Sequence, residues 1–212
     1  MVLPAAVRKQ LGIKPGDQLD VQVEGDQVVI RKAPQSYVKA LEKVTAPLWK
    51  GYARELQGDR DQNGIRSLNR IPAGSRIALD AISFVYFLER HPTYYPSAKD
   101  LFERIEKGKI EAVASTLVLT EMLAPASRAE DLSRAQEVLR LLTHLPDLKL
   151  IEVTANIASE ASRIRAESSL RTPDALHLAT AIMQKADWFV TNDKAFTRLP
   201  NLPLKISLFS AS

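Results

Sequence analysis

The stretch Arg76-Ile-Ala-Leu-Asp80 decides the fold class of this 212-residue chain. It is an apolar run that stops at a carboxylate, and a helical pattern follows it over residues 82–89. Short continuous apolar runs are typical of strands that are buried on both faces of a parallel sheet. The closing aspartate would then lie at the carboxyl edge of the sheet, where ligands bind in α/β folds.

The same strand-and-helix unit recurs in the rest of the chain. We expect strands at residues 110–114, 148–153, 188–191 and 204–208, and helices at residues 98–107, 116–123, 127–143, 157–167 and 172–185. Thr172 is expected to cap the last helix, with Pro173 in its first turn. The alternation predicts an α/β unit over residues 75–212, with a parallel sheet covered by helices.

The first third of the chain follows a different pattern. A short helix at residues 5–11 precedes two period-2 strands that a Gly25-Asp26 turn joins, so residues 1–33 predict a β-hairpin unit. This unit is too small to bury a core alone, so we expect it to dimerise. Residues 34–74 are interpreted as a helical tail and a polar linker.

Composition limits the class of protein. Residues 1–70 carry 12 Lys and Arg against 8 Asp and Glu, whereas the remainder is balanced, so the net charge of +4 lies in the first third and favours a nucleic-acid partner there. The absence of cysteine excludes disulfides and thiolate metal sites. Because no apolar run reaches about 18 residues and no signal peptide is visible, we expect a cytoplasmic protein without a membrane span.

Four carboxylates are predicted to meet at one edge of the sheet: Asp80, Glu121, Asp174 and Asp193. Asp80 and Asp193 follow strands, and Glu121 lies just inside the helix after a strand. Asp174 lies in the first turn of its helix, on the loop side. Clustered carboxylates repel one another unless a cation neutralises them, and hard oxygen ligands favour Mg²⁺ or Mn²⁺. A divalent cation in such a site can activate water for phosphodiester hydrolysis.

Each of these acids also has a simpler interpretation. Asp80 is a possible helix N-cap, the macrodipole favours Asp174 at a helix start, Asp193 suits a turn, and Glu121 suits a solvated helix face. His177 lies three residues after Asp174 and shares its helix face, so we interpret it as a core or supporting histidine rather than a catalytic one.

At these residues the sequence resembles PIN-domain ribonucleases, the VapC-type toxins. The resemblance rests on residues 77–83, 115–121, 172–179 and 190–193, in family order, and covers about residues 76–208. It implies a Mg²⁺- or Mn²⁺-dependent endoribonuclease with the four acids as catalytic metal ligands. It also implies supporting roles for Ser83, Thr191 and Asn192.

Residues 3–8, 11–17 and 28–32 resemble the AbrB/MazE-like swapped-hairpin DNA-binding domain of antitoxins. That family usually carries one more strand before the Leu3-Pro4 step, so we expect an incomplete hairpin domain. The candidate contacts to DNA phosphates are Arg8, Lys9 and Lys14. The alternative is that these three residues are ordinary solvated charges.

In such antitoxins a helical tail wraps the toxin, and the segment with Trp49, Tyr52 and Leu56 resembles one. Arg54 and Arg60 are candidate inhibitory residues, because an arginine can occupy an acidic site in place of a cation; solvated charges on a linker helix are the alternative. The chain is therefore predicted to join an antitoxin segment to its own RNA-cleaving toxin.

Two functions remain open. The first is a latent endoribonuclease whose N-terminal segment restrains it and binds operator DNA. The second is a DNA-binding transcriptional regulator that uses an inactive PIN domain as a dimerisation scaffold. In either case we expect a homodimer or a higher homo-oligomer, built partly through apolar faces of the 82–89 and 98–107 helices.

Overall fold

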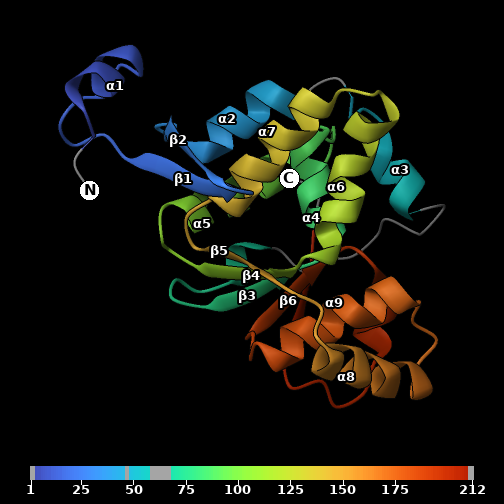
Figure 1. Cartoon of the computed structure of the whole chain (residues 1–212). Helices are drawn as coiled ribbons and strands as arrows, with labels where there is room; N and C mark the ends of the chain where they lie inside the picture. Colours follow the sequence, from blue (N-terminus) through green and yellow to red (C-terminus); the bar gives the residue numbers. More distant parts are fainter. Residues whose placement is uncertain (1–2, 46–47, 58–67, 210–212) are drawn as a thin grey trace.

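The computed structural model describes residues 3–45, 48–57 and 68–209. Its centre is a five-stranded parallel sheet with the strand order β5-β4-β3-β6-β7 (Figure 1). The strands are β3 (Arg76–Leu79), β4 (Glu111–Ser115), β5 (Leu148–Ile151), β6 (Trp188–Thr191) and β7 (Lys205–Leu208). The predicted α/β class with a parallel sheet is confirmed.

Helices cover both faces of this sheet (Figure 1). In β3, Ile77 and Leu79 enter one hydrophobic cluster, whereas Ala78 between them enters the other, because successive side chains of a strand point to opposite faces. The first cluster holds residues of α4 (Ala81–Leu88), α5 (Tyr95–Glu106), α6 (Leu117–Arg128) and α7 (Leu132–Thr143). The second holds residues of α8 (Ala155–Ala166) and α9 (Thr172–Met183). The 3₁₀ helices are η1 (Leu68–Arg70) and η2 (Lys194–Arg198).

The start of α9 differs by one residue from the prediction. Thr172 was expected as the N-cap, but it is the first helical residue, and Arg171 occupies the cap position with an extended backbone. The reason is that the Ala175 amide already donates to the Arg171 carbonyl oxygen at 3.0 Å, which adds Thr172 to the first turn. Pro173 lies in the first turn as expected.

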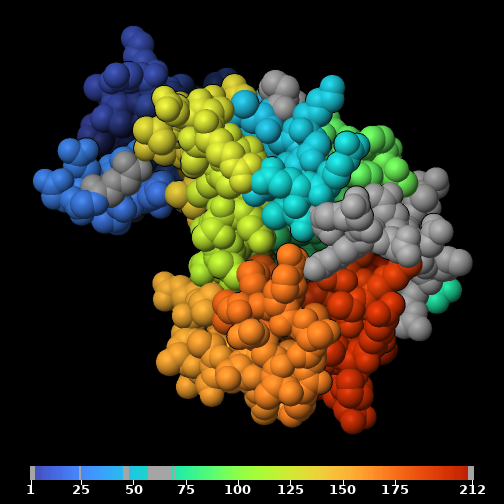
Figure 2. Space-filling model, turned by 90° about the vertical axis from the view of Figure 1, so that its right-hand side faces the viewer, coloured from blue at the N-terminus to red at the C-terminus, as the bar shows by residue number. Residues whose placement is uncertain are grey.

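The tail before the sheet packs into the larger hydrophobic cluster. It consists of α2 (Tyr37–Thr45) and α3 (Tyr52–Gln57), which lie against α4, α5 and α7. The Trp49 side chain between them is 0% exposed, and its indole Nε1 donates to the Met122 carbonyl oxygen of α6 at 3.0 Å. Figure 2 shows α3, in cyan, seated against this side of the molecule.

This packing overturns the surface predicted for oligomerisation. Every residue of α4 is buried, and the apolar residues of α5, including Leu101 and Phe102, are buried as well. These faces are covered within the chain because α2 and α3 pack on them. The apolar residues of the 82–89 and 98–107 helices therefore leave no large free surface for a second copy.

The N-terminal unit is a short helix followed by an antiparallel hairpin. Its elements are α1 (Ala5–Gln10), β1 (Leu19–Glu24) and β2 (Gln27–Lys32). Gly12 follows α1 with φ of +62°, a left-handed conformation that favours glycine at a helix end. Val23 and Val28 pair across the hairpin and are 73% and 60% exposed, so this face has no cover within the described chain.

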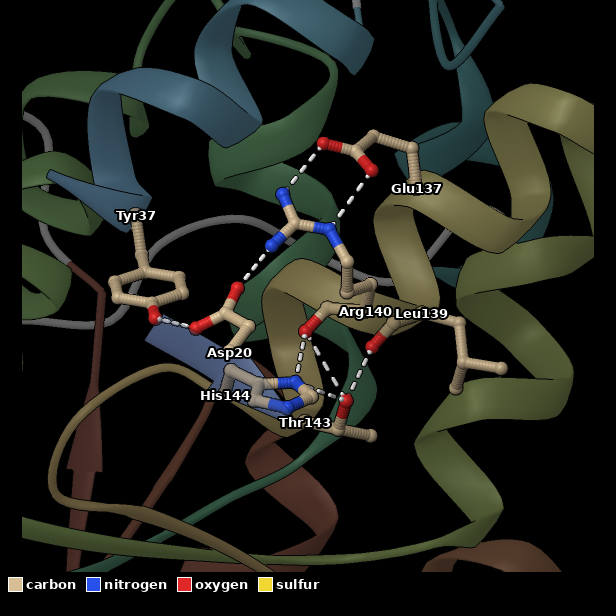
Figure 3. Close-up of polar contacts among 7 residues, drawn as sticks. All are labelled: Asp20, Tyr37, Glu137, Leu139, Arg140, Thr143 and His144. Carbon is tan, nitrogen blue, oxygen red and sulfur yellow. Dashed lines mark hydrogen bonds and ion pairs between the residues drawn. The ribbon is translucent and has the colours of Figure 1, made fainter. Parts of the chain in front are cut away.

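A buried polar network joins the hairpin to α7 (Figure 3). Asp20 of β1 is 5% exposed, and its carboxylate accepts hydrogen bonds from the Tyr37 hydroxyl and the Arg140 guanidinium. Arg140 also donates to Glu137 from Nε at 2.9 Å and from Nη2 at 2.7 Å. Burial, and then the hydrogen bond to Asp20, raises the pKa of Tyr37, which therefore stays a neutral donor.

None of the helices in the described ranges is both long and apolar enough to cross a membrane.

Candidate active site

The four predicted carboxylates line one cavity of about 50 Å³. β3, β6, α6 and α9 place them there, because parallel strands end at the same edge of the sheet. The lining residues are Leu56, Asp80, Ala81, Ile82, Glu121, Arg171, Asp174, His177 and Asp193. In Figure 2 a hollow lies between the lime-green start of α6 and the orange α9.

Asp80 is the most constrained of the four acids. It directly follows β3 and caps α4, since its Oδ1 accepts from the Ile82 amide at 3.1 Å. The Thr191 hydroxyl at the end of β6 donates to its Oδ2, and Ser83 Oγ lies 3.5 Å from Oδ1 while it donates to the Val190 carbonyl at 3.2 Å. Asp80 therefore caps α4 and lines the cavity at the same time.

The environment of Asp80 disfavours its negative charge. The pKa of Asp80 is raised to about 8, mainly by burial and to a smaller extent by the charges of Glu121 and Asp174. The hydrogen bond from Thr191 acts in the opposite direction. At neutral pH this carboxyl group therefore lacks enough nearby positive charge to ionise fully.

Glu121 and Asp174 face each other from two helices. The pKa of Glu121 is raised to about 7, mainly by burial and also by the charge of Asp174, while Arg171 lowers it. Arg171 also donates from Nε to Asp174 Oδ2 at 3.1 Å. Arg171 was not among the predicted site residues, although its spacing of three residues from Asp174 is typical of an ion pair on a helix.

The last acid is anchored by the turn after β6. Asp193 accepts from the Ala195 amide at 2.8 Å as the cap of η2, and its own amide donates to Thr191 Oγ1 at 3.1 Å. Asn192 points elsewhere, because its Nδ2 donates to the Tyr86 hydroxyl at 2.6 Å. Thr191 therefore links two of the acids, whereas Asn192 ties this turn to α4.

His177 lies beside these carboxylates and is 5% exposed. Its Nε2 is 4.0 Å from Glu121 Oε2, which is too far for a hydrogen bond. Burial lowers the pKa of His177 to about 4, so the ring is neutral at physiological pH and this contact is no ion pair.

A divalent cation fits the chemistry of this cavity. The lining carboxylates supply hard oxygen ligands, and Glu121 Oε2 is a buried oxygen without a hydrogen-bond partner in the described chain. No three His, Asp or Glu side chains within the described ranges form a ready-made metal group. Carboxylates repel one another until a cation neutralises them.

Comparison with protein families tests the two resemblances seen in the sequence. The family model described as PIN domain matches residues 77–202, more than half of the chain. The chain belongs to the PIN domain family. A second model, described as "Antidote-toxin recognition MazE, bacterial antitoxin", matches residues 1–37. Both resemblances seen in the sequence are confirmed, and the chain joins the two domain types of a toxin–antitoxin system.

The chain is similar to solved structures of toxin–antitoxin proteins. A structure of VapBC2 from Rickettsia felis, bound to a DNA fragment from its promoter, matches with a TM-score of 0.51 and 22% identity over 64% of this chain and 99% of that chain. VapC20 from Mycobacterium tuberculosis, a Sarcin-Ricin loop cleaving toxin, matches with a TM-score of 0.46 and 17% identity over 61% and 98%. No curated protein sequence matches the chain.

The tail reaches the PIN-domain cavity through an apolar side chain. Leu56 of α3 is among the residues that line the cavity. Arg54, a predicted inhibitory residue, is exposed and is not one of the described lining residues, and its charge acts on Glu89 instead. Arg60, the second predicted inhibitory residue, lies outside the described residues.

The three basic residues predicted to contact DNA lie away from the PIN-domain cavity. Arg8 and Lys9 are exposed in the last turn of α1, and Lys14 is exposed in the turn that follows. The backbone amide of Lys14 donates to Asp17 Oδ2 at 2.7 Å, which fixes that turn.

Proposed function

We propose that this protein is a metal-dependent endoribonuclease of a toxin–antitoxin system, with its antitoxin-like segment in the same chain. The observation that carries the proposal is the single cavity lined by Asp80, Glu121, Asp174 and Asp193 in a PIN domain. Four carboxylates in one partly buried cavity are unfavourable without a cation, and they are the oxygen ligands that Mg²⁺ or Mn²⁺ prefers.

The four acids would hold the ion. When bound, such a cation would supply positive charge to a phosphate oxygen and lower the pKa of a water molecule. The chain's own contribution is to fix these ligands: Thr191 and the Ile82 amide orient Asp80, and the cap of η2 orients Asp193. Arg171 lines the same cavity with an exposed guanidinium, so it is placed to bind a phosphate of the RNA.

RNA cleavage by the full chain tests this proposal. We expect slow cleavage with Mn²⁺ or Mg²⁺, none with EDTA, and a further loss of at least about 100-fold in Asp80→Asn with its folded state retained, since a ligand of the metal is changed. Asp187→Asn is a matched control, because Asp187 lies at the opposite end of the sheet, where it accepts from the Arg76 amide. Wild-type cleavage by Asp80→Asn would contradict the site.

We further propose that the N-terminal unit binds operator DNA through Arg8, Lys9 and Lys14. Their exposure and the MazE-like match support this, and the Rickettsia felis complex, similar in fold to the PIN domain, is described as bound to promoter DNA. The alternative function, a DNA-binding regulator with an inactive PIN scaffold, predicts salt-sensitive DNA binding without RNA cleavage. Measuring both activities on one preparation separates the two.

We also propose that the tail restrains the nuclease in the full chain without abolishing its activity, because Leu56 of the tail lines the cavity. Cutting the chain at residue 71 is a poor test of latency, since it would remove Trp49 and the other buried tail residues from the core. Leu56→Ala and Arg60→Ala in the full chain are better. An increase in cleavage in either variant supports inhibition by the tail. Arg54→Ala is the control, because Arg54 is exposed on α3 and is not among the described residues that line the cavity.

A further inference from the structure

His177 is a buried polar side chain for which the proposed function has no use. Neither of its ring nitrogens has a hydrogen-bond partner among the described residues, and both are sealed from solvent. Glu121 Oε2 is in the same condition. These unpaired atoms are neighbours, since His177 Nε2 lies 4.0 Å from Glu121 Oε2, about 1 Å more than a hydrogen bond.

Leaving such atoms unpaired in a dry site is unfavourable, because each has lost its hydrogen bonds to water. The two atoms belong to different helices, α6 and α9, and both side chains line the acidic cavity. A side-chain movement of about 1 Å would join them. Asp174, three residues before His177, is paired with Arg171 and does not satisfy the ring.

We propose that His177 is a positioning residue for Glu121, a role that rests on the proposed metal site. Its Nε2–H donates to Glu121 Oε2 and fixes the carboxylate, so that the other oxygen, Oε1, is left for the divalent cation. Metal-binding carboxylates are commonly held by a hydrogen bond of this kind, and its removal weakens metal binding.

A direct bond between the cation and the imidazole is the competing arrangement. The geometry favours the positioning role, because Nε2 is sealed from solvent against a carboxylate oxygen that is also sealed. The carboxylates of the cavity already supply the oxygen ligands that Mg²⁺ and Mn²⁺ prefer. The two arrangements differ in whether nitrogen touches the metal, which can be measured.

The test uses Mn²⁺ binding to the full chain, followed by the electron paramagnetic resonance of free and bound Mn²⁺. His177→Phe keeps a ring but removes the donor, whereas His177→Gln keeps an N–H at the position of Nε2. His144→Gln removes an imidazole at the end of α7, which is no part of the cavity, and is the matched control. We expect about 10- to 100-fold weaker binding in His177→Phe and near-wild-type binding in the other two variants.

Several outcomes would overturn the proposal. Unchanged affinity in His177→Phe would show that the donor does not matter, and an equal loss in the Phe and Gln variants would show that an N–H at this position does not hold Glu121. A ¹⁴N coupling to bound Mn²⁺ in the wild type would make His177 a metal ligand instead. If the wild type binds no Mn²⁺, the proposed metal site fails as well. If it binds Mn²⁺ but neither the wild type nor Leu56→Ala cleaves RNA, only the proposed substrate fails.

A measurement on the unmodified protein keeps the proposal testable if a variant does not fold. ¹⁵N spectra of the histidine rings in the Mg²⁺-loaded chain report which nitrogen of His177 carries the proton. The proposal requires the Nε2–H form, with that proton protected from solvent exchange. The Nδ1–H form would leave Nε2 unable to donate to Glu121 and would overturn the assignment.

Discussion

The hairpin and the tail both precede the PIN-family match, but they are attached to the PIN domain by different means. The tail places Trp49 in the core at 0% exposure and joins α6 through an indole hydrogen bond. The hairpin leaves Val23 at 73% exposure and is tied to α7 through the buried polar network of Asp20. The tail is thus part of the hydrophobic core of the PIN domain, whereas the hairpin is an appended unit.

Because the tail and the hairpin are attached differently, we expect substitutions in them to affect global and local stability, respectively. Removing a core residue destabilises the whole cooperative unit, whereas breaking the attachment of an appended unit opens that unit alone. Substitutions in the tail should therefore lower the free energy of unfolding of the entire protein. Substitutions in the hairpin should mainly change the local protection of the hairpin.

The largest effect is expected for Trp49→Ala. It removes a fully buried indole and its hydrogen bond to Met122, and we expect a loss of about 3–5 kcal/mol in the free energy of unfolding. Urea denaturation measures this loss. Lys50→Ala, at the exposed neighbouring position, should change stability by less than about 0.5 kcal/mol. A loss below about 1 kcal/mol in Trp49→Ala would mean that the tail is not part of the core.

A somewhat smaller and local effect is expected for Asp20→Ala. The buried Arg140 would keep Glu137 but lose its partner in β1, so we expect about 3 kcal/mol less protection of the β1 and β2 amides from hydrogen exchange. The PIN-domain amides should be nearly unaffected. Asp26→Ala in the exposed hairpin turn is the control. An equal loss of protection in α7 and β3 would show that the hairpin is not a separate unit.

The two regions also differ in their relation to the acidic cavity, since Leu56 of the tail lines it and no described hairpin residue does. Because burial raises the pKa of Asp80 to about 8, the folded state holds a proton that the unfolded state, with the ordinary pKa of 3.8, releases. Stability is therefore lost as pH rises from about 4 to 8. Asp80→Asn should remove this loss and stabilise the folded state at pH 8, with no gain at pH 3.5.

Thermal denaturation without metal at both pH values measures this gain. Leu56→Ala should let water reach the cavity and reduce the pH dependence, whereas Val23→Ser in the hairpin should leave it unchanged. If Asp80→Asn gives the same change at both pH values, the carboxyl group is not held in its protonated form by the site.

The features of the fold that depend on local sequence patterns were predicted well. The buried run ending at Asp80 and the strand ending at Thr191 are continuous apolar segments, and parallel strands bring their ends to one edge, so the cavity of four acids followed from topology. The contact of Trp49 with Met122 and the pairing of Asp20 with Arg140 join residues 73 and 120 positions apart, and no local pattern specifies them.

The same limit explains the errors around the helices. The apolar faces of α4 and α5 were interpreted as an oligomer surface because the sequence does not show that α2 and α3 cover them. The approach of His177 to Glu121 depends on how α6 and α9 are placed, although the shared helix face of Asp174 and His177 was visible from their spacing. The spacing of apolar residues shows which face of a helix is buried. It does not show which other element of the fold packs on that face.

The smallest effect on stability is expected at the exposed face of the hairpin. Val23 and Val28 pair across β1 and β2 and are exposed, so replacing both by serine should change the free energy of unfolding of the monomer by less than about 0.5 kcal/mol. Because the apolar faces of α4 and α5 are buried, this valine face is the surface we expect to join two copies. Light scattering at micromolar concentration should therefore give a dimer for the wild type and a monomer for the double variant. Val153→Ser, at an exposed valine after β5, is the control and should remain a dimer. A monomeric wild type, or a double variant that stays dimeric, would exclude the hairpin as the dimer interface while leaving the role of the tail in the core unchanged.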